Sequence, residues 1–139
     1  MDEVRAKVVL QNDRDIFLYE QGKIKKDQIR EVRIDALVDT GAVMILLPQD
    51  IVETLGLGKV EKAIVALANE EKIEMDVMGP IALTIANRRM TTDCLMGPPR
   101  CEPLIGQLVM ERLDLVIDPL KRTLTARPES PYLPLLKLK

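Results

Sequence analysis

The sequence predicts an all-β fold, a barrel or a sandwich, with one or two short helices. Apolar or alternating segments of strand length recur along the chain and are separated by Gly, Pro, Asn and Asp. Helical start and stop signals occur twice, at residues 48–55 and 107–113. The 139 residues suffice for one domain, expected over residues 1–126 and followed by a Pro- and Leu-rich tail over residues 127–139.

The N-terminal part of the chain is expected to contain four strands. Residues 6–10 and 16–19 are apolar segments on either side of a polar turn at residues 12–15. Residues 31–38 alternate charged and apolar side chains, which indicates a half-buried strand with Asp35 at the surface. Residues 43–47 are apolar and are expected to resume as a buried strand.

The remaining elements are a helix, three hairpins and a second helix. The first helix has Pro48 in its first turn and Gly56 directly after its end, both typical of helix boundaries. The second helix, residues 107–113, follows the segment Leu104-Ile105-Gly106. The expected hairpins pair residues 63–68 with 72–77, residues 81–86 with 90–96, and residues 115–117 with 123–125.

The composition excludes several classes of function. The net charge is -2 with both signs spread along the chain, so no basic stripe indicates nucleic acid or an anionic membrane as a partner. No segment approaches the roughly 20 apolar residues of a membrane span. The charged N-terminal residues contain no signal-like apolar stretch, so a cytoplasmic protein is expected. Aromatic residues make up only 2%, so the core must consist of aliphatic side chains and Met.

Histidine is absent from the sequence. This excludes Ser-His-Asp and Cys-His nucleophilic sites, histidine bases and histidine-containing metal sites. Cys94 and Cys101 flank a Gly-Pro-Pro turn, and we expect reduced packing residues there rather than a disulfide or a zinc site. An enzyme made from this chain must use carboxylates, Lys, Tyr, Cys or a bound cofactor.

Asp39 is the strongest candidate for a chemical role. It opens the segment Asp39-Thr40-Gly41-Ala42 at the end of an apolar strand, where an ionised carboxylate is costly to desolvate. Thr40 supplies a hydroxyl, and Gly41 lets backbone amides approach the carboxylate. The tripeptide alone is a weak signal, because it arises by chance in about one chain of this length in thirty to forty. A strand-end turn in which Asp39 caps backbone amides is the alternative interpretation.

The order of features after Asp39 resembles that of the retroviral-type (retropepsin-like) aspartic proteases. In that family an Asp-Thr-Gly-Ala loop is followed by a flap hairpin, a strand pair and a hydrophobic-hydrophobic-Gly segment leading into a short helix. The resemblance extends from Ile34 to Thr125. The matching segments are residues 39–42 for the loop, 63–77 for the flap, 81–96 for the strand pair and 104–106 for the segment before the helix.

The resemblance implies a retropepsin-like acid-protease β-barrel with aspartic endopeptidase activity. The implied catalytic residues are Asp39, Thr40 and Gly41. The implied substrate-binding residues, which would contact a peptide or protein, are Ala42, Ala66, Leu67, Ala68, Asn69 and Glu70. Leu104, Ile105 and Gly106 would support the loop from behind. For Asn69, Glu70 and Glu71, a solvated hairpin tip is the alternative to a working flap.

The resemblance also implies a homodimer, because the chain contains one Asp-Thr-Gly and the family uses two. Two adjacent carboxylates share one proton, so that one activates a water and the other donates a hydrogen bond to the peptide carbonyl. This chemistry needs neither a metal nor a cofactor. The alternative function is a catalytically silent retropepsin-like module that binds peptides or dimerises.

Three features depart from the viral pattern: the flap tip, the residues around the catalytic loop and the helix-leading glycine, and the length, because the N-terminal thirty residues and the C-terminal tail exceed the viral size. The flap tip contains no glycine. In many viral relatives, an Arg directly after the helix-leading glycine forms an ion pair with an acid just beyond the catalytic loop. Here Gln107 follows Gly106, and Val43 and Met44 follow the loop, so this ion pair cannot form. The dimer must therefore be stabilised by other contacts. The tail over residues 127–139 is expected at the dimer interface, a disordered extension being the alternative.

Overall fold

The computed structural model describes residues 3–129, which contain nine strands, three α-helices and one 3-10 helix. The strands are β1 (Arg5–Asn12), β2 (Glu31–Val38), β3 (Leu46–Pro48), β4 (Gly58–Ala66), β5 (Lys72–Ile85), β6 (Arg88–Gly97), β7 (Leu104–Ile105), β8 (Leu115–Asp118) and β9 (Thr123–Ala126). The helices are α1 (Asp13–Glu20), the 3-10 helix η1 (Lys26–Gln28), α2 (Gln49–Leu55) and α3 (Gln107–Leu113).

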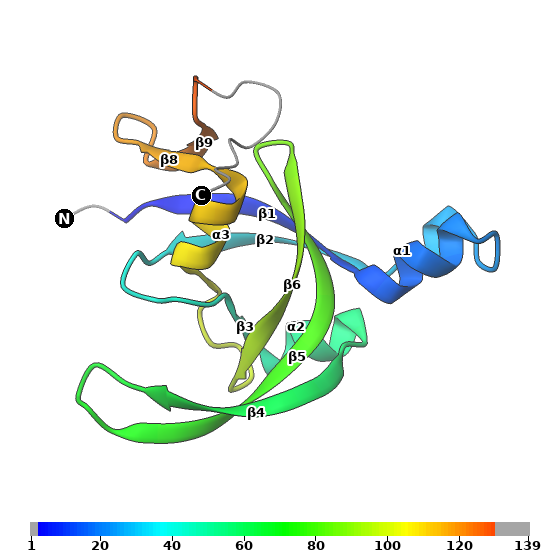
Figure 1. The fold of residues 1–139 in the computed structure, drawn as a ribbon, viewed down its shortest axis with the longest axis horizontal. Helices are drawn as coiled ribbons and strands as arrows, with labels where there is room; N and C mark the ends of the chain where they lie inside the picture. Colours follow the sequence, from blue (N-terminus) through cyan, green and yellow to red (C-terminus); the bar gives the residue numbers. More distant parts are fainter. Residues whose placement is uncertain (1–2, 130–139) are drawn as a thin grey trace, which may run out of the picture.

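Seven strands form one curved sheet in the order β1-β2-β7-β3-β6-β5-β4, and an additional β1–β5 pairing closes it (Figure 1). The β2–β7 and β3–β6 pairs are parallel, and the other pairs are antiparallel. Closure leaves no free sheet edge between β1 and β5, so the strands enclose a common interior. The prediction of an all-β fold with few short helices is confirmed.

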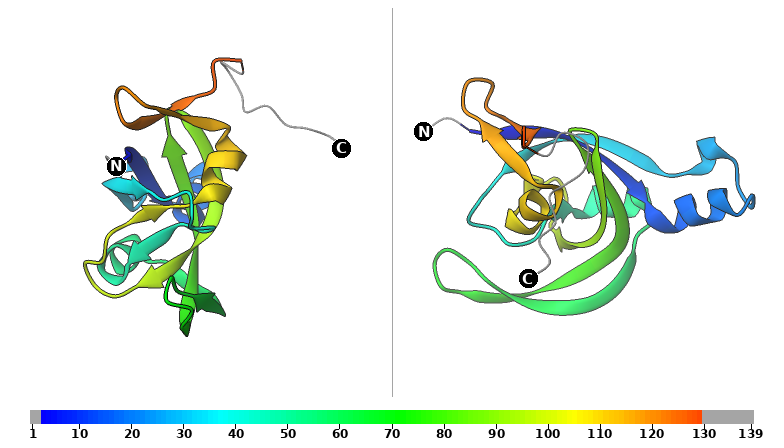
Figure 2. Two further views of the ribbon diagram at one scale, coloured as in Figure 1. Left: turned by 90° about the vertical axis from the view of Figure 1, so that its left-hand side faces the viewer. Right: turned by 45° about the horizontal axis from the view of Figure 1, so that its top comes forward.

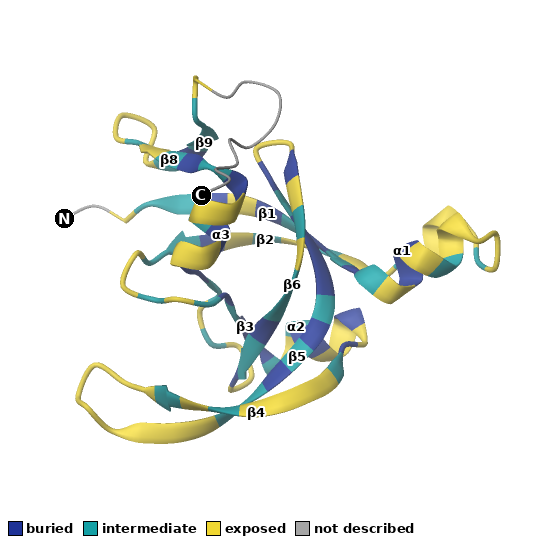
Figure 3. Cartoon of the chain, viewed as in Figure 1, coloured by how far each residue is buried: buried dark blue, intermediate teal, exposed yellow. Residues whose placement is uncertain are grey.

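The core is aliphatic, as the scarcity of aromatic residues requires. Leu10 of β1, Leu83 of β5, Leu55 of α2 and Leu113 of α3 are fully buried in one cluster. Figure 3 shows buried segments in dark blue along β1, β5 and β6. Phe17, in contrast, is 58% exposed. Burial of these branched side chains supplies the main driving force for closing the sheet.

The predicted strand at residues 16–19 is wrong, because this segment belongs to helix α1. The Asn12 side chain accepts a hydrogen bond from the Asp15 amide at 3.1 Å, and Asp13 and Asp15 lie in the first turn, where carboxylates favour a helix N-terminus. The Asp15 carboxylate also binds the Arg30 guanidinium at 2.8 Å and 3.0 Å. β1 therefore pairs with β2, and α1 projects from the barrel (Figures 1 and 2).

The predicted strand at residues 43–47 is too long, because only Leu46–Pro48 pair as β3. The Val43 carbonyl instead accepts a hydrogen bond from the Leu108 amide of α3 at 3.1 Å. The segments predicted at residues 72–77 and 81–86 are parts of one long strand, β5. Its register with β6 shifts between Met78 and Ile81.

The predicted short helices are both present. α2 begins after Pro48 and ends at Gly56, whose positive φ of 65° suits a glycine at a helix C-terminus. α3 spans the residues predicted for the second helix. Among residues 3–129, none of the helices has the length and apolar character needed to cross a membrane.

β8 and β9 form a separate two-stranded sheet beside the barrel. The turn between them is fixed by Asp118, whose Oδ1 accepts hydrogen bonds from the amides of Leu120 and Lys121. The Arg5 amide donates to the Arg122 carbonyl and ties the hairpin to β1. The predicted tail lies outside the described residues from position 130 onward, so its placement and the domain boundary at residue 126 stay predictions.

Candidate active site

Asp39 is positioned by the parallel pairing of β2 with β7. Leu37 pairs with Leu104, and Val38 pairs with Ile105. The Asp39 amide then donates to the Ile105 carbonyl at 3.0 Å, which extends the pairing by one residue beyond the strand. The predicted support segment, residues 104–106, therefore lies directly behind the predicted catalytic loop.

The Asp39 carboxylate is bound by the main chain of its own loop. Its Oδ1 accepts a hydrogen bond from the Gly41 amide at 2.9 Å, and its carbonyl accepts one from the Ala42 amide at 3.1 Å. A Cβ atom on Gly41 would lie 3.3 Å from Oδ1, so the small residue permits this close approach. Asp39 is half-buried in the single chain, whereas Thr40 and Gly41 are exposed.

The loop and helix α3 hold each other through main-chain hydrogen bonds. The Gln107 amide donates to the Ala42 carbonyl at 2.8 Å, and the Leu108 amide donates to the Val43 carbonyl at 3.1 Å. These amides belong to the first turn of α3, where N–H groups have no carbonyl acceptor within the helix. Gly106 lies so close to the loop that a Cβ atom on it would be 2.6 Å from the Val43 oxygen. Glycine is therefore required at this position.

The predicted flap residues form the tip of the β4–β5 hairpin. The Leu67 amide donates to the Glu71 carbonyl at 2.8 Å, the Glu70 amide donates to the Leu67 carbonyl at 2.9 Å, and Glu70 has a positive φ of 70°. The hairpin tip predicted at residues 69–71 is confirmed. In Figures 1 and 2 the hairpin extends beyond the barrel on the same side as the loop between β2 and β3.

The two faces of this hairpin differ in chemistry. Val65 pairs with Ile73, and the same face continues to Val77, which is buried in the barrel. The opposite face carries charged side chains, among them Lys62 and Glu74, whose Nζ and Oε2 atoms lie 3.9 Å apart. Near the tip one face of the flap is thus mainly apolar, and the other is mainly charged, with Ile64 exposed among the charged side chains.

A cavity of about 310 Å³ adjoins the loop at Thr40. Met110 and Leu115 give it an apolar lining, and Glu111 and Asp114 contribute carboxylates. The Asp114 carboxylate binds the Arg127 Nε at 2.7 Å across the end of α3. Nothing in the sequence predicts this cavity, because its residues are scattered from position 40 to 127 and form no local pattern.

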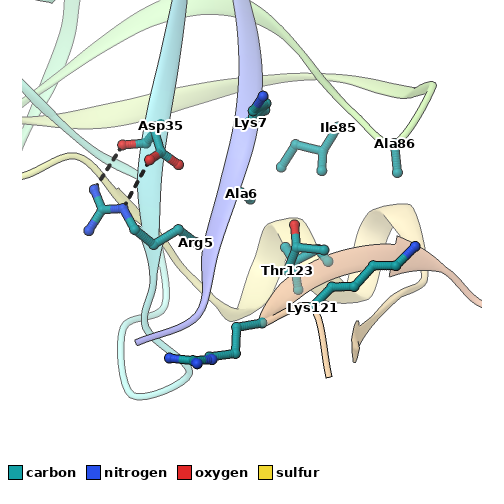
Figure 4. Close-up of a pocket in the computed structure, with 10 residues that line it drawn as sticks. Arg5, Ala6, Lys7, Asp35, Ile85, Ala86, Lys121 and Thr123 are labelled. Atoms are coloured by element: carbon teal, nitrogen blue, oxygen red, sulfur yellow. Dashed lines mark hydrogen bonds and ion pairs between the residues drawn. The ribbon is translucent and has the colours of Figure 1, made fainter. Parts of the chain in front are cut away.

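A larger cavity of about 440 Å³ lies away from Asp39, between β1 and the β8–β9 hairpin. Its charged side chains include Arg5, Lys7 and Lys121, but Arg5 is bound to Asp35, and the two lysines point in different directions (Figure 4). This cavity has no convergent polar groups and is not a candidate active site. Asp35 is exposed at its rim, as predicted.

The remaining chemistry-bearing residues do not form a second centre. Cys94 is buried and Cys101 is half-buried, and both are free thiols. Among residues 3–129 there is no group of three Cys, Asp or Glu side chains placed to hold a metal ion. Among the described residues, Asp39 and its loop are therefore the candidate active site.

The curved sheet, the Asp39 loop and the glycine that leads into α3 together define a retropepsin-like fold. Among solved structures, EIAV protease complexed with the inhibitor HBY-793 is similar to this chain, with a TM-score of 0.58 over 81% of this chain and 89% of that chain. The sequence identity is 15%, so the likeness shows the fold alone. No protein-family model and no curated protein matches the sequence.

The structure brings two of the three predicted groups of residues together. Residues 39–42 and 104–106 are in direct hydrogen-bonded contact. The flap residues 66–70 form a separate hairpin, whose approach to Asp39 stays a prediction. The role of Val43 is not predicted by its residue type. This residue lies at a position predicted as strand, but it is 62% exposed and its carbonyl accepts a hydrogen bond from α3.

Proposed function

We propose that the chain is an aspartic endopeptidase that acts as a homodimer, with Asp39 of each copy forming the catalytic pair. One observation carries the proposal. The Asp39 carboxylate is held at 2.9 Å by the Gly41 amide, in a loop that is anchored to Ile105 and packed against Gly106. A retropepsin-like fold that holds an Asp-Thr-Gly loop in this way is suited to carboxylate-based hydrolysis.

The proposed reaction uses the two carboxylates in different protonation states. Two adjacent carboxylates cannot both ionise at low cost, so they share one proton. The ionised Asp39 takes a proton from a water, whose oxygen bonds to the peptide carbonyl carbon. The protonated Asp39 donates a hydrogen bond to the carbonyl oxygen, and a proton then passes to the nitrogen as the carbon–nitrogen bond breaks.

The flap supplies the cover that this reaction requires. The apolar face containing Val65 and Ile73 would contact apolar side chains of an extended peptide, and closure over the substrate would exclude water. Asn69 and Glu70 at the tip would then lie over the peptide. Peptide or protein is the proposed substrate class.

Dimerisation is required because one chain carries one Asp-Thr-Gly. A two-fold axis between the loops would bring the two Asp39 side chains together and bury the exposed Thr40 of each copy against the other. Thr40 would brace the loops rather than react.

The proposal is tested by peptide cleavage with three proteins: wild type, Asp39→Asn, and Asp35→Asn as a matched control four residues earlier, on β2. We expect cleavage of a peptide library at mildly acid pH by the wild type. Asp39→Asn should lose at least about 10³-fold in rate, because the pair can no longer share a proton between two carboxylates. Asp35→Asn, whose carboxylate is exposed and bound to Arg5, should remain within about twofold of the wild type.

Cleavage that survives Asp39→Asn would overturn the proposal. A wild-type chain that binds peptides or dimerises without cleaving any of them, at every pH tested, would favour the silent binding module instead. Sedimentation and binding measurements on the same samples separate these outcomes.

A further inference from the structure

The cavity beside Thr40 combines an apolar wall with a negatively charged rim. Its volume is about 310 Å³, and the side chains of Met110 and Leu115 line it. Glu111 also lines it and is exposed, and the side-chain amide of Gln107 donates a hydrogen bond to the Glu111 carboxylate at 3.2 Å. An apolar segment that also carries a cation would match both features.

The described part of the chain ends close to this cavity. Arg127 is one of the residues that line it, and Glu129 is the last residue described. Two hydrogen bonds hold Arg127, because its amide donates to the Asp114 carbonyl at 3.1 Å and its Nε donates to the Asp114 carboxylate at 2.7 Å. The sequence after Glu129 therefore starts from a fixed point near the cavity wall.

The sequence that follows has a composition that matches the cavity. Residues 130–139 contain four leucines, one tyrosine and two lysines, and no acidic residue. Leu133 comes six residues after Arg127, so the chain between them spans at most about 20 Å and is long enough to return to the cavity. Pro131 and Pro134 restrict the backbone of the unbound segment, which lowers the entropy lost when it is ordered.

We propose that residues 130–139 pack into the cavity beside Thr40 of their own chain, with leucine side chains against Met110 and Leu115 and with Lys137 near Glu111. A segment tethered at the cavity wall has an effective concentration on the order of millimolar, which favours the same chain over a second copy. The contact needs neither a dimer nor catalysis, so it does not depend on the proposed function. Because Thr40 belongs to the cavity wall, the packed segment would extend the surface that a second copy covers in the proposed dimer.

Disulfide trapping in the full chain tests this contact. Cys101→Ser serves as the background, so that the buried Cys94 is the one native thiol left in the sequence. Glu111→Cys at the cavity rim is then combined with Lys137→Cys. Under mild oxidation at low micromolar concentration, we expect these two thiols to form a disulfide within one chain, detected by intact mass as a monomer that has lost two hydrogens.

Arg112→Cys combined with Lys137→Cys is the matched control. Arg112 follows Glu111 directly on α3 and is also exposed, but it does not line the cavity. An unbound segment reaches both positions about equally, whereas the packed segment should cross-link to position 111 at least about tenfold faster. Equal rates at the two positions, or no cross-link at either, overturn the proposal.

Two further samples identify which chain fills the cavity and what holds it there. An equimolar mixture of the single variants Glu111→Cys and Lys137→Cys cannot cross-link within a chain. A covalent dimer that forms in this mixture as fast as the double variant cross-links overturns the proposal, because the segment of the other copy then fills the cavity. Leu133→Asp with Leu136→Asp, added to the double variant, should reduce its cross-linking rate to that of the control, because apolar anchors are lost. An unchanged rate overturns the proposed packing.

Peptide cleavage by the wild type separates failure of this contact from failure of the proposed function. A chain that cross-links preferentially at position 111 but cleaves no peptide supports the contact and counts against the function. A chain that cleaves peptides but shows no such preference overturns the contact and leaves the function intact.

Discussion

Gly106 lies against the backbone of Val43 so closely that a Cβ atom would be 2.6 Å from the Val43 oxygen. Real Cβ atoms do not approach a carbonyl this closely, so any side chain at position 106 must displace the loop that carries Asp39. The same oxygen accepts the Leu108 amide of α3. The contact thus links the candidate catalytic loop to the helix behind it.

Gly106→Ala is therefore expected to damage both stability and activity. The added methyl should cost about 1–3 kcal/mol in free energy of unfolding, because backbone on both sides must shift. Urea denaturation measures the stability change, and peptide cleavage measures the effect on the loop. Gly58→Ala is the matched control, since its Cβ atom would meet nothing closer than 3.8 Å. Equal effects of the two substitutions would contradict this account of the loop.

The ion pair between Asp15 and Arg30 should make stability depend on pH. The hydrogen bonds from Arg30 lower the pKa of the Asp15 carboxyl, whose side chain is only 8% exposed. A carboxyl with a lower pKa in the folded state stabilises the fold above its unfolded pKa of about 3.9. That contribution is lost as the pH falls through the folded pKa.

Asp15→Asn tests this dependence. The wild type should exceed the variant by about 1–3 kcal/mol in free energy of unfolding at pH 6, because two charge-assisted hydrogen bonds are lost. The difference should begin to shrink below about pH 4, where the carboxyl of the unfolded chain takes up its proton, and it should disappear as the pH falls through the lowered pKa of the folded state. Asp27→Asn controls for the loss of one negative charge near α1. A difference that is constant from pH 6 to pH 3 would count against the ion pair.

Glu70 at the flap tip occupies the left-handed region, with a φ of 70°. Residues other than glycine adopt this conformation at a cost of about 1–2 kcal/mol. Replacement by glycine removes this cost, but the greater conformational entropy of glycine in the unfolded chain offsets part of the gain. Glu70→Gly should therefore stabilise the fold by about 0.5–1 kcal/mol. Glu71→Gly removes the same charge one residue further on, where φ is not positive, and should not stabilise. Thermal unfolding of both variants provides the comparison.

The two free thiols should differ in reactivity. Burial raises the pKa of Cys94 to about 12, and it is fully inaccessible to solvent. Burial also raises the pKa of Cys101, but this residue is only half-buried. At pH 8, iodoacetamide should therefore alkylate Cys101 before Cys94 in the folded protein, as peptide mass spectrometry can show. As a control, the two cysteines should lose this order of alkylation when the protein is unfolded in urea.

The sequence predicts the candidate site better than the path of the chain around it. Strand, loop and helix at residues 31–42 and 104–113 follow from short-range patterns and were predicted in the right order. The role of Val43 was not predicted, because its apolar side chain suggests a strand, whereas its backbone carbonyl accepts a hydrogen bond from α3. The residue type does not show whether the backbone carbonyl accepts such a hydrogen bond.

Helix α1 shows a second limit of the sequence. Residues 16–19 favour a strand by propensity, but Asn12 caps the segment and Asp15 is bound by Arg30, fifteen residues further on. The capping pattern was present in the sequence and was interpreted as a turn. The partner of Asp15 could not be predicted, since nothing local identifies Arg30.

The main-chain hydrogen bonds between the loop and α3 also determine how freely the amino-acid sequence around such a site can change. Carbonyls of Ala42 and Val43 and amides of Gln107 and Leu108 make these bonds, so the geometry at Asp39 makes few demands on four of the side chains around it. Those positions can change over evolutionary time, and of the two glycines beside Asp39 only Gly106 is held to one residue type by the backbone around it. A fold of this kind can therefore persist while its sequence drifts almost beyond detection.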